Sequence, residues 1–332
     1  MKIYHHLKGC FFIIFVFSLF LFSCSESHNR IKNYQISLTR NVTQINRDLQ
    51  LYLNIIQEVA QTTEHLYNNQ DDYSNDLLSN RYIALPNGVL LSRVEEGRSV
   101  VFVSGFVPIT EEIKRIVYFT ESIEDIFIDF VDSTPEIIQI YFTEKHSYIR
   151  IYPPFDVLQT YRAGIDFTNF NYYYLANESF NPLRNPLFIE DPHFEQYENS
   201  WVASAIAPVY HFDEMSGVVG MNINVNMLFD KWVLDTDSEE IAAFFMTKDG
   251  FWVAGDKESK SLLGLSTDFE QYYEVFEAHN IAYHNDTNIQ NIARRLISGN
   301  KNFVASINDK MYYVLCADIT PLSWFLVYIL QN

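Results

Sequence analysis

The pattern of apolar and polar positions first predicts a long amphipathic helix near the N-terminus. From Leu38 onward, apolar residues recur at alternating steps of four and three, which places them in one stripe along a helix. A helix of about 40 residues would be roughly 60 Å long, more than one small domain needs. Its e and g positions lack the systematic charges of a coiled coil, so we interpret it as a spine that runs along two domains. The stripe comprises Leu38, Val42, Ile45, Leu49, Tyr52, Ile56, Val59, Thr63 and Leu66.

The same pattern predicts a central β-hairpin between Trp201 and Val225. Two segments with the period of strands flank a polar turn that ends at Gly217. The second segment alternates an apolar face with a face of small or polar residues, among them Gly220 and Asn222. On pattern alone this could be a plain core hairpin, so the functional question is what the polar face contacts.

Other elements precede the hairpin. Residues 109–132 have helical periodicity, with Thr110 suited to the N-cap, and residues 136–142 and 148–152 have the pattern of two short strands. Residues 155–200 show little periodicity but many aromatic, Asn and Pro residues. Long irregular segments inside compact domains are uncommon and are usually functional, so we expect a ligand site there; the alternative is a structured surface excursion.

A smaller second domain is predicted after a polar break at residues 235–238. It begins with a hairpin over residues 242–254 and continues with a short helix over 289–297. Three consecutive strands end the chain, at residues 302–307, 310–317 and 324–330. The fold class is therefore α+β, with an N-terminal leader at 1–23, the long helix within 24–80, a first sheet domain at 81–234 and a second at 235–332.

The N-terminus carries a targeting signal. Lys2 and Lys8 precede an apolar run over residues 10–22, which is too short for a comfortable membrane-spanning helix. The run ends in Leu-Phe-Ser-Cys24, which resembles the lipobox of bacterial lipoproteins and implies lipidation of Cys24. Ser25 lacks the acidic character associated with inner-membrane retention, which favours the outer membrane if the cell is Gram-negative. The alternatives are an ordinary secretory signal or a signal anchor. Cys316 then has no partner for an intrachain disulfide, and we expect it to serve packing.

Composition and charge exclude several classes of function. The 332 residues contain 42 Asp and Glu against 23 Lys and Arg, a net charge of −19, which disfavours nucleic acid and anionic membrane surfaces as partners. The sequence has no zinc-protease motif, no Gly-x-Ser-x-Gly and no glycine loop that cradles phosphate. Residues 190–193 place two acids beside His193, which we interpret as polar surface. We therefore expect no enzyme, no metal and no cofactor.

Several stretches together resemble the double Cache sensor domains of bacterial extracytoplasmic receptors. They are IYPPFD at 151–156, GIDFTNFNYYYLAN at 164–177, NPLRNP at 181–186 and the central hairpin, and the likeness covers about residues 30–332. The resemblance implies two PAS-like antiparallel sheets strung along one helix. It also implies a small ligand in the membrane-distal unit, held between the sheet and the irregular segment.

The resemblance also assigns ligand-facing candidates. In the family, a guanidinium with an indole or phenol binds a carboxylate, and an acid with aromatic walls binds an ammonium. Phe188 stands where a tryptophan is common, and Asn222 where amino-acid-binding relatives carry an aspartate, so we do not expect an ordinary α-amino acid. The candidates are Tyr141, Arg150, Tyr152, Arg184, Phe188, Phe194, Glu195, Trp201, Ser204 and Asn222.

The sequence therefore predicts a lipid-anchored sensor on the periplasmic side of the envelope, without its own output domain. It would bind a small molecule in its first sheet domain and signal through an envelope partner. One alternative is a structural or interaction lipoprotein whose pocket is filled by its own aromatic residues. Another is the solute-binding lipoprotein of a transporter, which would need two lobes and a hinge.

Overall fold

The computed structural model describes residues 4–70, 81–93, 97–195, 200–233, 241–265 and 279–331, with side chains described from residue 29 onward. The chain divides into two compact units. The nine-strand unit contains residues 46–231 and 320–324. The five-strand unit contains the residues up to 45, 232–319 and 325–332.

Helix α1 runs from Tyr4 to Asn68 and contributes residues to both units. The predicted stripe is confirmed, because all nine of its members are buried, with Ile45, Leu49 and Ile56 fully enclosed. Among the described residues, no helix combines the length and apolar character needed to cross a membrane. The predicted leader at 1–23 and Cys24 lie outside the described side chains.

The nine-strand unit is built on one antiparallel sheet with the order β1-β2-β3-β5-β4-β9-β8-β6, and β7 also pairs with β8. The predicted hairpin is confirmed as β8 and β9, and the two predicted short strands as β4 and β5. The strands are β1 (Tyr82–Ala84), β2 (Leu90–Ser92), β3 (Val100–Val103), β4 (Ile137–Glu144), β5 (Tyr148–Tyr152), β6 (Leu187–Phe188), β7 (His193–Glu195), β8 (Ser200–His211) and β9 (Glu214–Asn224).

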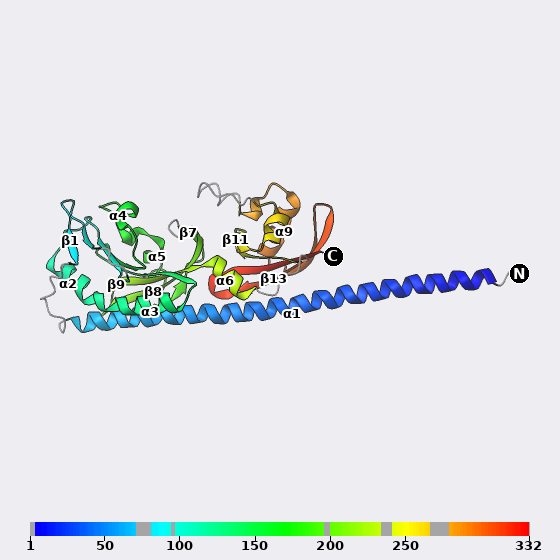
Figure 1. The fold of residues 1–332 in the computed structure, drawn as a ribbon, viewed down its shortest axis with the longest axis horizontal. Helices are drawn as coiled ribbons and strands as arrows, with labels where there is room; N and C mark the ends of the chain where they lie inside the picture. The colour runs from blue at the N-terminus through cyan, green and yellow to red at the C-terminus, as the bar shows by residue number, and fades with distance from the viewer. Residues whose placement is uncertain are drawn as a thin grey trace. The chain divides into compact units, whose positions relative to one another are not determined.

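Different elements cover the two faces of this sheet (Figure 1). One face, the helix face, lies against α1, α2 (Glu111–Phe119) and α3 (Glu124–Ser133), which the 3₁₀ turn η2 (Thr120–Ile123) joins. Thr110 caps α2 as predicted, and its Oγ1 accepts from the Ile113 N–H at 3.2 Å. The other face, the loop face, lies beneath the short pieces α4 (Val157–Thr160), η3 (Phe167–Asn169) and α5 (Asn171–Tyr174). Helix α6 (Val225–Trp232) follows β9.

The five-strand unit has an antiparallel sheet with the order β11-β10-β14-β13-β12. The three predicted C-terminal strands and the predicted helix are confirmed, and Cys316 is buried in the core beside α9. The predicted boundary at 235–238 lies outside the described residues. The elements are β10 (Ile241–Thr247), β11 (Trp252–Gly255), α7 (Lys257–Leu263), η5 (Ile281–Tyr283), α9 (Thr287–Ile297), β12 (Asn302–Ile307), β13 (Lys310–Ile319) and β14 (Trp324–Gln331), with η6 (Thr320–Leu322) before β14.

Candidate functional site

The strand register places three of the candidate residues on the loop face of the nine-stranded sheet. Residues directly opposite each other in an antiparallel pair point to the same face, and neighbours along a strand alternate. Ser204 of β8 lies opposite Asn222 of β9, and Asn222 lies opposite Gln139 of β4. Tyr141 is two residues further along β4 and therefore shares that face. Its ring contacts Tyr172 of α5 edge-on at 5.3 Å, which identifies the face as the loop face.

Four polar side chains form a row across this face. The Ser204 hydroxyl donates to Oδ1 of Asn222 at 2.8 Å, and Nδ2 of Asn222 donates to Oε1 of Gln139 at 3.0 Å. On the other side, Oγ of Ser204 lies 3.3 Å from Nδ1 of His193 in β7. We call these four residues the polar row. Ser204 is 1% exposed and Asn222 is 4% exposed, so water cannot reach their polar atoms. The hydrogen bonds within the row satisfy these buried groups in place of water.

The polar row carries no charge at neutral pH. Burial lowers the pKa of His193 to about 4, so its imidazole stays neutral and offers one donor and one acceptor. None of the described strand positions that the register places on the loop face is a lysine or arginine. Glu195 lies opposite Ser200 on this face and is the candidate that brings negative charge.

Tyrosine rings lie next to the polar row. Burial raises the pKa of Tyr141, and the charges of Tyr161 and Glu195 raise it further, so its hydroxyl stays protonated. The ring of Tyr141 occupies the space above Gly220, its partner in β9: a Cβ on that glycine would lie 2.0 Å from Cζ of the ring. The absence of a side chain at residue 220 is therefore what allows Tyr141 to lie against the sheet.

Arg150 and Tyr152 lie on the helix face of the sheet, so the prediction that they face the ligand on the loop face is wrong. Arg150 pairs with Phe142, whereas Tyr141 pairs with Ile151, and this register turns Arg150 to the helix face. The guanidinium is fully buried and donates to the Val117 carbonyl at 2.8 Å. The hydroxyl of Tyr152 donates to Asp132 of α3 at 3.3 Å.

The Arg150 guanidinium belongs to a buried ionic cluster. Its Nη1 lies 3.5 Å from Oε2 of Glu124, which also binds Arg81 at 2.8 Å. Burial lowers the pKa of Arg150, but Tyr148, Tyr82 and Glu124 outweigh that effect and the net pKa is raised, so the residue stays charged. This cluster ties β5 to the η2–α3 segment on the helix face, which is a structural role.

Three aromatic candidates also lie outside the candidate site, namely Phe188, Phe194 and Trp201. Trp201 and Phe194 lie opposite each other in β8 and β7, one residue away from the positions that face the polar row, and their rings contact edge-on at 5.6 Å. Phe188 lies opposite Ala205, which is likewise out of phase with Ser204. The register thus turns all three to the helix face, and they cannot fill a pocket on the loop face.

Arg184 lies at the tip of the β8–β9 hairpin. Its guanidinium stacks 4.0 Å from the centre of the Tyr210 ring and lies 3.7 Å from Asp213 and 3.6 Å from Glu178. Tyr210 is six residues along β8 from Ser204, about 20 Å at the rise of a strand. The structure therefore separates Arg184 from the polar row.

The sequence analysis missed four residues of this region. Gln139 precedes Tyr141 by two positions on a correctly predicted strand, so alternation alone could have found it. His193 was interpreted as polar surface, and the structure instead places it in the polar row, in a strand of three residues too short to show a period. Tyr161 and Tyr172 lie in the segment that we had predicted to hold the ligand.

No metal centre is present among the described residues: they contain no group of three or more His, Cys, Asp or Glu side chains that could hold an ion. The chemistry that the polar row offers is hydrogen bonding by neutral groups beside tyrosine rings.

Comparison with known proteins finds matches among solved structures. No family model matches the chain, and no curated protein matches it either. Solved structures do match. The ligand-binding domain of the Pseudomonas aeruginosa PAO1 amino acid chemoreceptor PctB in complex with L-Arg has a TM-score of 0.51 at 14% identity, over 89% of this chain and 92% of that chain. This chain has the double Cache fold.

Two further structures have the same double Cache fold. The PctB domain in complex with L-Gln has a TM-score of 0.52 at 12% identity, over 89% of this chain and 88% of that chain. The extracellular domain of mmHK1S-Z3, a candidate histidine kinase, has a TM-score of 0.50 at 11% identity, over 90% of this chain and 95% of that chain. At these identities the likeness concerns the fold.

Proposed function

We propose that this double Cache chain is an extracytoplasmic sensor domain that binds a small molecule on the loop face of its nine-stranded sheet, at the polar row. The fold supports this proposal, since the PctB domain that shares it was solved with L-Arg and with L-Gln. The family resemblance supports the same face, because it implies a ligand between the sheet and the irregular segment. A catalytic activity is not part of the proposal, because the solved structures that share the fold are a ligand-binding domain and an extracellular domain of receptors.

The observation that carries the proposal is the polar row itself. Four neutral polar side chains from four strands meet on a face that also carries buried apolar residues such as Ile149 and Ile206. Burying such groups adds little net stability even when they are bonded to each other. Ligand sites in general combine apolar and aromatic walls with a few placed polar groups, which is the composition found here.

The chemistry of the row favours a neutral ligand with hydrogen-bonding groups and a flat or apolar portion. A carboxylate or phosphate is normally bound by Arg or Lys, and the described strand positions of this face provide neither. An ammonium is bound by an acid; Asn222 is not one, and the acid of this face, Glu195, lies outside the polar row. An α-amino acid would need both partners, so we propose that it is not the ligand.

For the envelope location, we propose that residues 1–23 are a signal peptide and that Cys24 carries a lipid. The support is the lipobox-like Leu-Phe-Ser-Cys24 after a short apolar run. Expression of the full chain with a labelled fatty acid should label the protein, and Cys24→Ser should remove the label. Equal labelling of that variant and of the original chain would contradict a lipid anchor at Cys24.

A second candidate function is an interaction lipoprotein without a ligand. It is favoured by the closure of the polar row: both ends of the Asn222 amide are bonded within the row, and the Tyr141 ring is packed against Tyr172. Under that interpretation the row is a structural element and no small molecule changes it.

Thermal unfolding of residues 25–332 against a library of small molecules separates the two candidates. A ligand that binds only the folded state adds about 2.7 kcal/mol at a hundred times its dissociation constant, enough to raise the melting temperature by several degrees. We expect a hit among neutral compounds. Ser204→Ala should abolish the shift by removing the central hydroxyl of the row.

Ser216→Ala is the matched control. Ser216 is also a buried serine of the β8–β9 hairpin, 2% exposed, but it lies near the turn and outside the polar row. The control should keep the full ligand response. Equal loss in both variants, or a library without any stabilising compound, would count against the sensor proposal and favour the interaction lipoprotein.

A further inference from the structure

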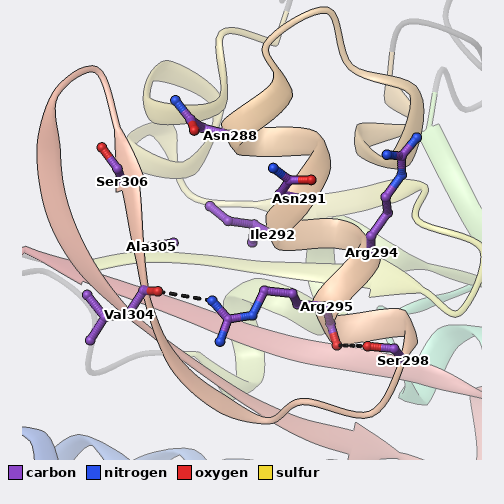
Figure 2. A pocket seen from close by; sticks show the side chains of 9 residues that line it. All are labelled: Asn288, Asn291, Ile292, Arg294, Arg295, Ser298, Val304, Ala305 and Ser306. Atoms are coloured by element: carbon purple, nitrogen blue, oxygen red, sulfur yellow. Dashed lines mark hydrogen bonds between the residues drawn. The ribbon is translucent and has the colours of Figure 1, made fainter.

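The five-strand unit contains a polar hollow of its own. It has a volume of about 510 Å³ and lies between α9 and the edge strand β12 (Figure 2). That volume is within the range of small-molecule sites in proteins. Its polar lining consists of Asn288, Asn291, Arg294, Arg295, Ser298 and Ser306.

The charge of this hollow is opposite to that of the chain. Acids outnumber bases 42 to 23 over the whole sequence, yet the stretch from 287 to 307, which forms α9 and β12, contains no acid, and two of its three bases, Arg294 and Arg295, line the hollow. The nearest acid before this stretch, Asp286, caps α9 and accepts from the Asn288 N–H at 2.7 Å. A cation-bearing, acid-free hollow on an acidic protein concentrates anions locally.

Two contacts hold Arg295, an exposed residue that lines the hollow, in place. Its Nη1 donates to the Val304 carbonyl of β12 at 3.1 Å, and the guanidinium stacks 3.8 Å from the centre of the Phe303 ring. Figure 2 shows the side chain reaching from α9 across to β12, while Arg294 extends the other way. A positioned guanidinium loses little conformational entropy when it binds, and its remaining N–H groups suit the two oxygens of a carboxylate or phosphate.

Two amides complete the arrangement. Asn288 and Asn291 are three residues apart on α9 and Arg295 is four further on, a spacing that puts all three on one side of the helix. Figure 2 shows both amides on the part of α9 that borders the hollow, with Ser306 across from them on β12. Donors from two elements can therefore converge on one group.

We propose that this hollow binds a small dissolved anion that carries a carboxylate or phosphate group. Arg295 provides the charge, and the side-chain amides of Asn288 and Asn291 provide neutral donors. The site differs from the polar row in both place and chemistry: it is in the other unit, and it selects a charge that the polar row does not attract. The proposal stands whether or not the polar row binds a ligand.

Isothermal titration of the full chain in non-ionic detergent, with inorganic phosphate and with succinate at constant ionic strength, tests the proposal. We expect saturable binding of at least one of the two anions. Asn291→Asp should weaken it at least tenfold, about 1.4 kcal/mol, because it adds a negative charge beside Arg295. Asn291 is exposed, so this variant should fold even if Arg295→Gln disturbs the packing on Phe303.

Two control variants show whether a loss of affinity is specific to the hollow. Lys310→Gln removes an exposed positive charge of the same unit outside the hollow, and Ser204→Ala alters only the polar row; both should keep the original affinity. Absence of saturable binding up to about 10 mM of either anion would overturn the proposal. So would binding that Asn291→Asp leaves unchanged, or binding that Lys310→Gln weakens as much as Asn291→Asp does.

Discussion

Replacing the buried arginine of the helix face, Arg150, should destabilise the nine-strand unit more than replacing the half-buried Arg184. Arg150→Met keeps a similar side-chain volume and removes the charge and all hydrogen bonds. The guanidinium is fully buried and makes contacts of 2.8 Å to the Val117 carbonyl, 2.9 Å to the Tyr148 hydroxyl and 3.0 Å to the Ser99 hydroxyl. Glu124 keeps Arg81 as a partner at 2.8 Å.

The magnitude follows from what these partners lose. Each buried polar group left without a partner costs about 1–3 kcal/mol, and breaking a buried ion pair from one side costs about 3–5 kcal/mol. Because Arg81 still neutralises Glu124, the costs do not simply add, and we expect about 3–5 kcal/mol in total. Arg184→Met removes ion pairs of 3.6 and 3.7 Å to exposed acids and the stacking on Tyr210, and should cost about 1–2 kcal/mol.

Urea unfolding of residues 25–332, followed by tryptophan fluorescence, measures both variants. With a slope of about 2–3 kcal/mol per M, Arg150→Met should lower the urea midpoint of the nine-strand unit by roughly 1–2 M. The five-strand unit should keep its midpoint. A midpoint shift for Arg150→Met no larger than that for Arg184→Met would refute the structural role of the buried cluster.

Three further predictions concern other positions. Gly220→Val should cost at least about 2–3 kcal/mol in the same urea assay, because even its Cβ would overlap the Tyr141 ring, and a midpoint near the original value would show that the ring can move away. The folded-state pKa of His193 is lowered from 6.5 to about 4, so the free energy of unfolding should fall by on the order of 3 kcal/mol as the pH drops from about 7 to 4. His193→Gln should flatten this part of the curve of stability against pH. A curve that the variant leaves unchanged would contradict the burial of His193. Burial raises the pKa of Cys316 to about 12, so in a Cys10→Ser, Cys24→Ser background a thiol reagent at pH 8 should react only after unfolding, and rapid reaction of the folded protein would contradict its packing role.

Local periodicity explains why the elements could be predicted from the sequence. The buried stripe of α1 and the β8–β9 hairpin follow from spacing along single segments, and the cap at Thr110 follows from three neighbouring residues. The irregular segment was also placed correctly as a part of the nine-strand unit next to the sheet, because Tyr172 packs on Tyr141.

The faces of the strands could not be predicted in the same way. Whether Arg150 lies beside Tyr141 or behind it depends on the pairing of β4 with β5, and a shift of one residue would reverse every side chain. Trp201 is different: it lies three residues from Ser204 on the same strand, so alternation alone could have placed the two side chains on opposite faces. Arg184 has a backbone φ of 54° in a loop, where no period fixes the direction of a side chain.

Hydrogen exchange with and without a stabilising library compound tests the central claim most directly, because it locates the ligand on the chain. We predict slower amide exchange in the four strand segments that carry the polar row, 137–143, 193–195, 200–206 and 218–224, and unchanged exchange in 241–255 of the other sheet. We also predict that Ser204→Ala removes this protection while Arg184→Ala keeps it. Protection confined to the five-strand unit, or protection of the polar row that survives Ser204→Ala, would contradict the account.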